Sequence, residues 1–201
     1  MKLLIATPSY DPTVCIQTYS AMLELDRCGM EVESFNPEGY TVEMARTMAA
    51  DRALEAGADW LLFVDSDVVP PSDALANMLE HDADVCFGYY LASRGHGEET
   101  CLFEPGGDQY DRCYTKMHLH LLRDGGTRKV EVRGGGLGFA LVRASVFGRI
   151  REPWFRFSWD RDSRKKRLSE DLHFCTRCRE AGIALIGDTR ADCGHVRNTV
   201  V

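Results

Sequence analysis

One short stretch, residues 58–69 (ADWLLFVDSDVV), constrains the fold more than any other part of the chain. Its apolar segment, 60–64, is too short to span a membrane and is bounded by polar residues, a pattern typical of a buried central strand. The strand leads directly into two carboxylates, Asp65 and Asp67, on either side of Ser66. Because side chains alternate along an extended chain, we expect both carboxylates to project to the same side.

Two carboxylates this close together repel each other, and a cation between them would relieve the repulsion. A divalent metal ion that prefers oxygen ligands, bound by one or two carboxylates and by substrate phosphates, is the natural candidate. The alternative is a strand that ends in a polar turn, where aspartates are common. The spacing of Asp65 and Asp67 by itself is compatible with both interpretations.

Length and charge narrow the class of protein. The 201 residues fit one domain with a sizeable core. Lys and Arg number 24 against 31 acidic residues, a net charge of -7, which disfavours a nucleic-acid surface because such surfaces are usually basic. No run approaches the roughly 20 apolar residues of a spanning helix, and the N-terminus lacks the long apolar region of a signal peptide. We expect a cytoplasmic protein without stable membrane insertion.

Strands and helices are expected to alternate along the first 90 residues. The pattern predicts strands at 2–6, 30–35, 60–64 and 84–90, and helices at 13–28, 42–56 and 72–81. Such alternation implies an α/β fold with an open, mostly parallel central sheet flanked by helices on both faces. In open sheets, ligands bind beyond the carboxyl ends of the strands, where residues 7–11 and 65–67 would lie.

The second half of the chain is more irregular, and residues 91–129 are expected to form loops with small strands. We predict a hairpin-like arrangement of 129–133 with 137–143, followed by a short helix around Ser145. A longer helix is predicted at 169–181 and a last strand at 183–186. We find no internal repeat and no linker, so a single domain over 1–201 is expected.

Three groups in this half are candidates for chemistry. Glu170 and Asp171 follow a candidate helix cap, Ser169, and either complement the helix dipole or act as a general base. His195 follows a strand and a glycine, and is either an ordinary histidine near the C-terminus or a neutral metal ligand at the sheet edge. The Gly134–Gly136 run either permits a tight turn or lets backbone approach a ligand, and it lacks a P-loop or dinucleotide fingerprint.

Two further patterns have alternative interpretations. The basic run at 161–167 either binds phosphates or acceptor anions, or forms a solvated loop. Cys175, Cys178, Cys193 and His195 have a spacing that is compatible with zinc. The first two of these cysteines lie inside a predicted helix, however, and the eight cysteines of the chain occur in apparent core segments, which favours buried, reduced thiols.

Taken together and in this order, four stretches resemble the GT-A glycosyltransferases, and they are similar in particular to compact bacterial and phage members of glycosyltransferase family 2. The Asp-x-Asp motif alone is unspecific, whereas the ordered set is specific. The four stretches are LLIATP at 3–8, the segment 45–67 that ends in FVDSD, GGLGFALVR at 135–143, and the helix that begins with SEDLHFC at 169–175, followed by His195.

The resemblance implies a GT-A fold and a metal-dependent transfer of a sugar from a UDP- or GDP-sugar to an acceptor hydroxyl, with inversion. It divides the chain into a nucleotide-binding half, 1–90, and an acceptor and catalytic half, 91–201. It implies Asp67 and His195 as ligands of Mn2+ or Mg2+, with Asp65 completing the shell or near the ribose. The implied nucleotide-sugar contacts are Thr7, Pro8, Tyr10, Arg46, Asp65, Ser66, Gly135 and Gly136. The implied general base is Asp171, with Glu170 second, and the basic run before Ser169 would be a lid over the bound donor.

Two other functions are compatible with parts of the pattern. A sugar nucleotidyltransferase would carry a Gly-rich basic loop after the first strand, but residues 7–13 contain neither glycine nor a cation, which disfavours it. A non-catalytic nucleotide-binding or scaffold protein of the same fold is disfavoured because the acids and the histidine are all present. A glycan, a lipid-linked glycan, a protein and modified DNA are all compatible acceptors.

Overall fold

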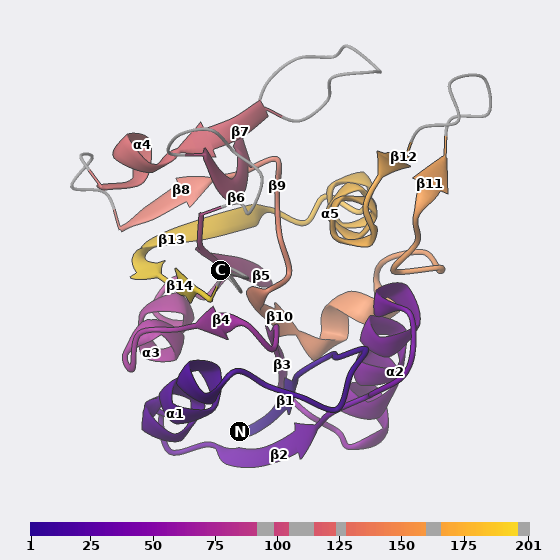
Figure 1. The fold of residues 1–201 in the computed structure, drawn as a ribbon. Helices are drawn as coiled ribbons and strands as arrows, with labels where there is room; N and C mark the ends of the chain where they lie inside the picture. The colour runs from indigo at the N-terminus through magenta and orange to yellow at the C-terminus, as the bar shows by residue number, and fades with distance from the viewer. Residues whose placement is uncertain (92–98, 105–114, 124–127, 160–165, 197–201) are drawn as a thin grey trace.

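A seven-stranded sheet forms the centre of the computed structural model, which describes residues 1–91, 99–104, 115–123, 128–159 and 166–196 (Figure 1). In sheet order the strands are β2 (Glu31–Phe35), β1 (Lys2–Ala6), β3 (Trp60–Val64), β10 (Phe139–Arg143), β5 (Val85–Tyr89), β13 (Leu185–Asp192) and β8 (Lys129–Glu131). The strands β1, β2 and β3 are parallel, and so are β5 and β13. Because β10 is antiparallel to both β3 and β5, five strands run in one direction, as the sequence predicted.

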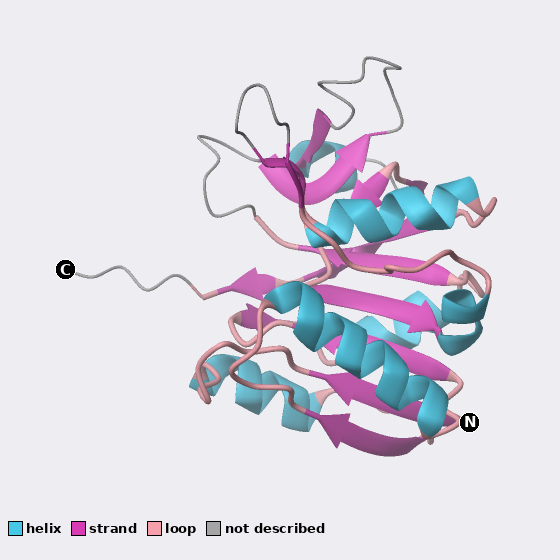
Figure 2. Ribbon diagram, turned by 90° about the vertical axis from the view of Figure 1, so that its right-hand side faces the viewer, coloured by secondary structure: helices cyan, strands magenta, loops and turns pink. Residues whose placement is uncertain are grey.

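Helices cover both faces of this sheet (Figure 2), which confirms the predicted layers. One core cluster includes Met78 of α3 with Met22 of α1 packed against it, and the other includes Ala49 of α2 and Phe174 of α5. Within the described part of the chain, no helix has both the length and the apolar character needed to cross a membrane. The helices are α1 (Ile16–Glu24), α2 (Val42–Glu55), α3 (Ala74–Leu79), α4 (Leu119–Arg123), the short 3-10 helix η1 (Ala144–Gly148) and α5 (Glu170–Glu180).

The central strand β3 is buried along its whole length, in accordance with its unbroken apolar sequence. On one face, α2 packs against it with a row of alanines whose small size lets the helix lie close to the sheet. On the same face, Phe63 of β3 meets Phe155 edge to face, with the ring centroids 5.8 Å apart. The strand therefore ends at a rigid position, from which Asp65 follows directly.

The hairpin that we predicted from 129–133 and 137–143 is wrong. In the sheet, β8 and β10 are separated by β13 and β5. Between them in sequence, β9 (Gly134–Gly135) instead pairs with β6 (Glu99–Glu104), which also pairs with β7 (Thr115–His118). Two strand-like segments around a glycine break fit a hairpin locally, but β10 is instead buried between β3 and β5, while β8 pairs with β13 at the end of the sheet.

Two predicted elements also differ in their bounds; one of them, the first helix, ends at Glu24 instead of residue 28. The last strand extends to Asp192 instead of ending at Ile186, because its outer part pairs with β8 and again with Tyr89. The first helix begins at Ile16 instead of residue 13, because the preceding loop is extended and the Cys15 N–H donates to the Ser66 carbonyl at 2.9 Å. Small strands complete the structure: β4 (Val68–Val69) with β14 (Gly194–His195), and β11 (Ser158–Trp159) with β12 (Lys166–Leu168).

Two buried thiols lead to a prediction about alkaline pH. Burial raises the pKa of both Cys101 and Cys175 from 9.0 to about 12. A raised folded-state pKa means that the stabilisation is complete below pH 9 and is lost as the pH rises from 9 to 12. We expect the free energy of unfolding to fall above pH 9 by about 1.4 kcal/mol per pH unit for each thiol.

Urea denaturation at several pH values between 7 and 11, under reducing conditions, measures this slope. The Cys101→Ala variant should show a shallower decline than the wild type. A Cys15→Ala variant, which changes a cysteine outside the core, serves as the control and should keep the wild-type slope. An equally steep decline in Cys101→Ala would contradict the assignment.

Candidate active site

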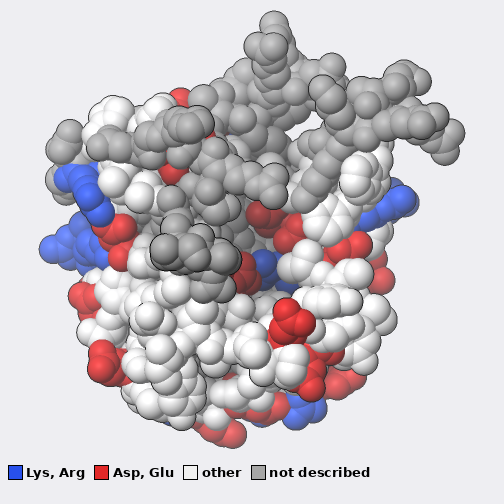
Figure 3. All heavy atoms as spheres, viewed as in Figure 1, with Lys and Arg blue, Asp and Glu red and all other residues white. Residues whose placement is uncertain are grey.

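The carboxyl ends of β1 and β3 lie next to each other, since Ala6 pairs with Phe63 in parallel register. The segments that follow, beginning with Thr7 and Asp65, therefore leave the sheet at the same edge. Figure 3 shows a hollow near the centre of one face of the molecule, where acidic and basic side chains meet.

The segment 65–67 is a turn rather than a continuation of the strand. The Asp65 N–H donates to the Gly138 carbonyl at 2.8 Å, and the Val68 N–H donates back to the Asp65 carbonyl at 3.1 Å. The alternation expected from an extended chain therefore stops at Val64, and the carboxylates of Asp65 and Asp67 have different partners. The expectation that both carboxylates project to the same side assumed an extended chain, whereas the chain turns here.

Asp65 is paired with a buried guanidinium. Arg46 of α2, only 3% exposed, donates from one terminal nitrogen to both carboxylate oxygens of Asp65, at 3.0 and 3.3 Å. Its other terminal nitrogen donates to the Leu137 carbonyl at 3.2 Å, and its Nε lies 3.5 Å from Oε1 of Glu170. Its guanidinium carbon lies 5.3 Å from the ring centroid of Phe63. Arg46 thus connects the turn after β3 to the start of α5.

The charges around Arg46 keep it protonated. Burial lowers the pKa of Arg46, but the carboxylates of Asp65, Glu170 and Asp171 raise it by more, so that the pKa lies above the ordinary value. A buried cation is retained only where paired charges compensate its desolvation. The arrangement gives Arg46 a structural role between two elements, and its contact with the nucleotide stays a prediction.

Asp67 is paired with His195, 128 residues later in the chain. The antiparallel pair of β4 and β14 places His195 opposite Val68, and the Val196 N–H donates to the Asp67 carbonyl at 2.8 Å. Nε2 of His195 lies 3.3 Å from Oδ2 of Asp67. The structure thus brings together two of the three residues predicted as metal ligands.

The contacts of the two His195 ring nitrogens indicate whether Nε2 can bind a metal ion. Its Nδ1 lies 3.1 Å from the Leu91 carbonyl, which only accepts, so this contact assigns the Nδ1 proton. In the neutral ring, Nε2 then presents a lone pair toward Oδ2 of Asp67, a second acceptor. Two acceptors facing each other are stabilised by a cation, and metal-bound histidines usually donate their other N–H to a carbonyl or carboxylate in this way.

The pair fits a divalent ion bound mostly by other groups. Ligands about 2.1 Å from an octahedral ion lie roughly 3 Å apart, close to the observed 3.3 Å between Nε2 and Oδ2. Among the described residues, no group of three or more His, Cys, Asp or Glu side chains is placed to hold a metal ion. A metal ion at Asp67 and His195 would therefore take its remaining ligands from water and substrate phosphates.

The alternative zinc site is not assembled in the described residues. Cys175 and Cys178 are buried in α5, where they belong to the core cluster on the α2 face, whereas Cys193 belongs to the cluster on the opposite face. The thiol of Cys175 faces the Gly135 carbonyl at 3.7 Å. These cysteines serve packing, as the helical context of the first two had suggested.

The start of α5 presents two carboxylates in different environments. Glu170 is buried, at 7% exposure, and faces Arg46. Asp171 is partly exposed, and its Oδ1 accepts from the Ser169 hydroxyl and from the Leu172 N–H, the latter at 2.8 Å. Ser169 makes no side-chain cap to the helix, contrary to the capping prediction, because its hydroxyl binds Asp171 instead.

The glycine run packs tightly against aromatic side chains. A Cβ on Gly135 would lie 2.7 Å from Cγ of Phe87, and a Cβ on Gly136 would lie 2.6 Å from the hydroxyl oxygen of Tyr90. Gly138 is equally restricted, at 2.5 Å from the same oxygen. These glycines are required by the close approach of side chains, and their contact with a donor stays a prediction.

Tyr90 is a residue of this edge that the sequence analysis missed. Burial, with Cys101, Asp65 and Asp171, raises its pKa well above the ordinary value, so the hydroxyl remains protonated. Its ring meets that of His195 at a centroid distance of 5.1 Å. Its position at the end of the predicted strand 84–90 was the available signal, because that end was expected at the same edge.

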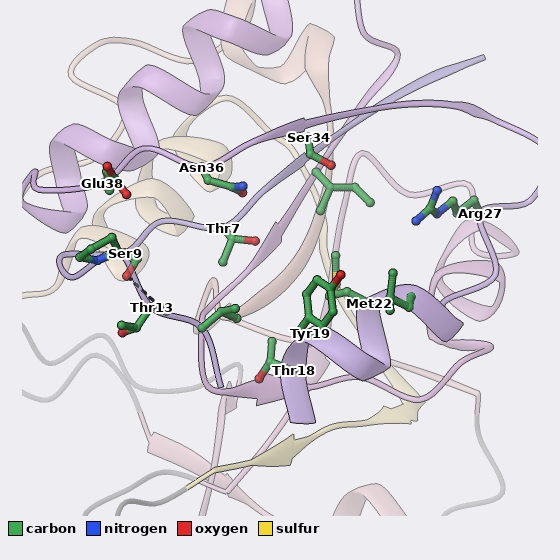
Figure 4. A pocket seen from close by; sticks show the side chains of 14 residues that line it. Thr7, Ser9, Thr13, Thr18, Tyr19, Met22, Arg27, Ser34, Asn36 and Glu38 are labelled. Atoms are coloured by element: carbon green, nitrogen blue, oxygen red, sulfur yellow. Dashed lines mark hydrogen bonds between the residues drawn. The ribbon is translucent and has the colours of Figure 1, made fainter. Parts of the chain in front are cut away.

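A pocket lies beside Thr7, between α1 and the strands β1 and β2 (Figure 4). It has a volume of about 340 Å³ and carries hydroxyl, amide and carboxylate groups, including Ser34, Asn36 and Glu38. The predicted Thr7 lines this pocket, whereas Pro8 and Tyr10 do not, and Tyr10 is 75% exposed. Of the predicted lid at 161–167, residues 161–165 lie outside the described residues.

Comparisons with known proteins bear on the fold. No protein family matches the sequence, and no curated protein matches it. Solved structures do match. A197 from STIV has a TM-score of 0.65 at 20% identity, over 98% of this chain and 87% of that one. GalNAc-T7 with UDP, GalNAc and Mn2+ has a TM-score of 0.62 at 12% identity, over 98% of this chain and 43% of that one.

A third match is S. aureus TarS 1-349 in complex with UDP-GlcNAc, with a TM-score of 0.56 at 14% identity. The match includes the whole of this chain and 60% of the TarS chain. The chain therefore spans most of A197 but less than two thirds of the GalNAc-T7 and TarS chains. At these identities the likeness establishes architecture, and together with the sheet and helix layers it shows that this chain has the GT-A fold.

Proposed function

We propose that this protein is a metal-dependent glycosyltransferase that moves a sugar from a nucleotide-diphosphate sugar to an acceptor hydroxyl, with inversion. The observation that carries the proposal is the pair of Asp67 and His195, with Nε2 and Oδ2 3.3 Å apart and the other imidazole nitrogen facing a carbonyl. The matching folds of GalNAc-T7 and TarS, solved with UDP, GalNAc and Mn2+ or with UDP-GlcNAc, support it.

Asp67 and His195 would hold Mn2+ or Mg2+, which when bound neutralises charge on the leaving diphosphate. Asp65 remains a candidate for the ribose or for the metal shell, although in the described structure it is occupied by Arg46. The remaining residues of the edge would bind and orient the donor.

We assign the nucleoside to the pocket beside Thr7. Its polar groups can pair with a base and a ribose, and its volume of about 340 Å³ is within the range of small-molecule sites. The loop that closes it is attached to the motif, since the Cys15 N–H donates to the Ser66 carbonyl at 2.9 Å. A nucleoside in the pocket would therefore have its phosphates near Asp65 and Asp67.

The chemical step assigned to this edge is a direct displacement. Asp171 takes the proton of the acceptor hydroxyl while the acceptor oxygen bonds to the anomeric carbon. The bond from that carbon to the phosphate oxygen breaks, and its electron pair leaves with the diphosphate, which inverts the configuration. Asp171 is the better candidate for the base than Glu170, because Glu170 is buried and lies 3.5 Å from the Arg46 guanidinium, whereas Asp171 is partly exposed.

Calorimetric titration of UDP and of GDP, each with and without Mn2+, tests the donor site. We expect one of the nucleotides to bind, and to bind much more weakly without Mn2+. Binding that ignores the metal would retain the nucleotide site and remove the role of Asp67 and His195. The absence of binding by both nucleotides would favour a non-catalytic protein of this fold.

Replacing Asp171 with asparagine is expected to lower turnover by at least about 100-fold while leaving nucleotide affinity unchanged, since general bases typically contribute 100- to 10,000-fold. Sugar transfer or donor hydrolysis, measured as release of the nucleoside diphosphate, gives the rate. A Glu180→Gln variant, at an exposed position of the same helix, is the matched control and should keep full activity. A loss of rate in both variants would remove the specific role of Asp171.

A further inference from the structure

Two consecutive residues, Tyr90 and Leu91, each contact His195. The Tyr90 ring lies against the imidazole, with a centroid distance of 5.1 Å and an interplanar angle of 62°. The carbonyl of the next residue, Leu91, accepts from Nδ1 of the same imidazole at 3.1 Å. The aromatic contact limits rotation of the ring, and the hydrogen bond selects its tautomer. Together they direct Nε2 toward Asp67.

The other end of Tyr90 contacts the segment that supports Asp65. Its hydroxyl oxygen lies 2.6 and 2.5 Å from the positions where Gly136 and Gly138 would carry a Cβ. Oδ2 of Asp65 lies 3.0 Å from that same position on Gly138, whose carbonyl accepts from the Asp65 N–H at 2.8 Å. One side chain therefore packs against both the imidazole and the backbone that supports the first aspartate.

We infer that Tyr90 is a positioning residue for the divalent cation and the donor diphosphate. Its ring sets the plane of His195, and its hydroxyl end holds the Gly136–Gly138 backbone beside Asp65. The effect on donor binding rests on the proposed function, whereas the effect on His195 does not. Outer groups that orient a ligand are typically worth 10- to 100-fold in metal affinity.

The neighbouring tyrosine provides a matched control. Tyr89 is buried, at 1% exposure, and its hydroxyl lies 3.4 Å from the Thr189 carbonyl. Tyr89 is the last residue of β5, and Tyr90 follows it directly. Tyr89→Phe therefore removes a hydroxyl that contacts Thr189, whereas the hydroxyl of Tyr90 lies against the Gly136–Gly138 segment.

The first experiment uses the metal-free protein without nucleotide. Long-range nitrogen–proton NMR spectra of the histidine side chains, with the His195 signals assigned by a His195→Asn variant, report the tautomer. We expect wild type, Tyr89→Phe and Tyr90→Phe to show His195 with its proton on Nδ1. The Tyr90→Met variant, which keeps apolar volume without the ring, should show a mixture of tautomers. A single Nδ1 tautomer in Tyr90→Met, or a changed one in Tyr90→Phe, would overturn the role of the ring.

The second experiment measures UDP and Mn2+ binding by calorimetry in the same proteins. We expect Tyr90→Met to weaken Mn2+-dependent UDP binding by about 10- to 100-fold, Tyr90→Phe by less, and Tyr89→Phe not at all. Wild-type affinity in Tyr90→Met would refute the inference. If wild type itself fails to bind UDP with Mn2+, the proposed function fails while the NMR result still decides the placement of His195. If Tyr90→Met does not fold, Tyr90→Leu, which also removes the ring, replaces it in both experiments with the same expected results.

Discussion

Replacing Arg46 with alanine is expected to lower the free energy of unfolding by about 3–5 kcal/mol, because the change breaks a buried ion-pair network. The guanidinium is 3% exposed and neutralises Asp65 and Glu170, of which Glu170 is 7% exposed. Without it, Glu170 would be a buried carboxylate without its cation. The cost arises from that uncompensated charge more than from the lost attraction.

Urea denaturation at pH 7 measures the loss for Arg46→Ala. The matched control is Arg52→Ala on the same helix, where a guanidinium that is 42% exposed pairs with Glu33, so that we expect a change of about 1 kcal/mol or less. Adding Glu170→Gln to Arg46→Ala should recover part of the loss by removing one of the charges. Equal, small effects of the two arginine variants would show that Arg46 is not central to the fold.

Replacing Asp67 with alanine is expected to abolish the Mn2+ dependence of nucleotide binding, with a loss of more than about 100-fold in affinity with the metal. This exceeds the 10- to 100-fold typical of outer groups because a direct ligand is removed. The fold should survive, since the Asp67 side chain is 44% exposed and its structural hydrogen bond uses the backbone carbonyl. Calorimetry with Mn2+ and UDP measures the loss, and thermal unfolding monitors the fold.

Two other aspartate variants test whether the loss of metal-dependent binding is specific to Asp67. Asp73→Ala changes an exposed aspartate without a side-chain cap at the start of α3, and should leave binding unchanged. Asp65→Ala should instead lower stability, because Asp65 is the closest carboxylate partner of Arg46. Metal-dependent binding that persists in Asp67→Ala would exclude the assigned ligand.

Local sequence patterns predicted much of the architecture. The unbroken apolar run at 60–64 predicted β3, and the alternation of strand and helix periodicities predicted a mostly parallel sheet with helices on both faces. These patterns are reliable because each depends on which face of a single element must be buried. They also singled out Asp67 and His195, which the structure brings together, although the roles of these residues remain proposals.

The tertiary structure sets which distant elements meet. It inserted β10 antiparallel between β3 and β5 and separated it from β8, against the local hairpin prediction. It also paired Asp65 with Arg46 and Asp67 with His195, and placed Tyr90 between the two pairs. No local pattern encodes such contacts, because they depend on how packed layers divide buried area and compensate buried charge over long stretches of chain.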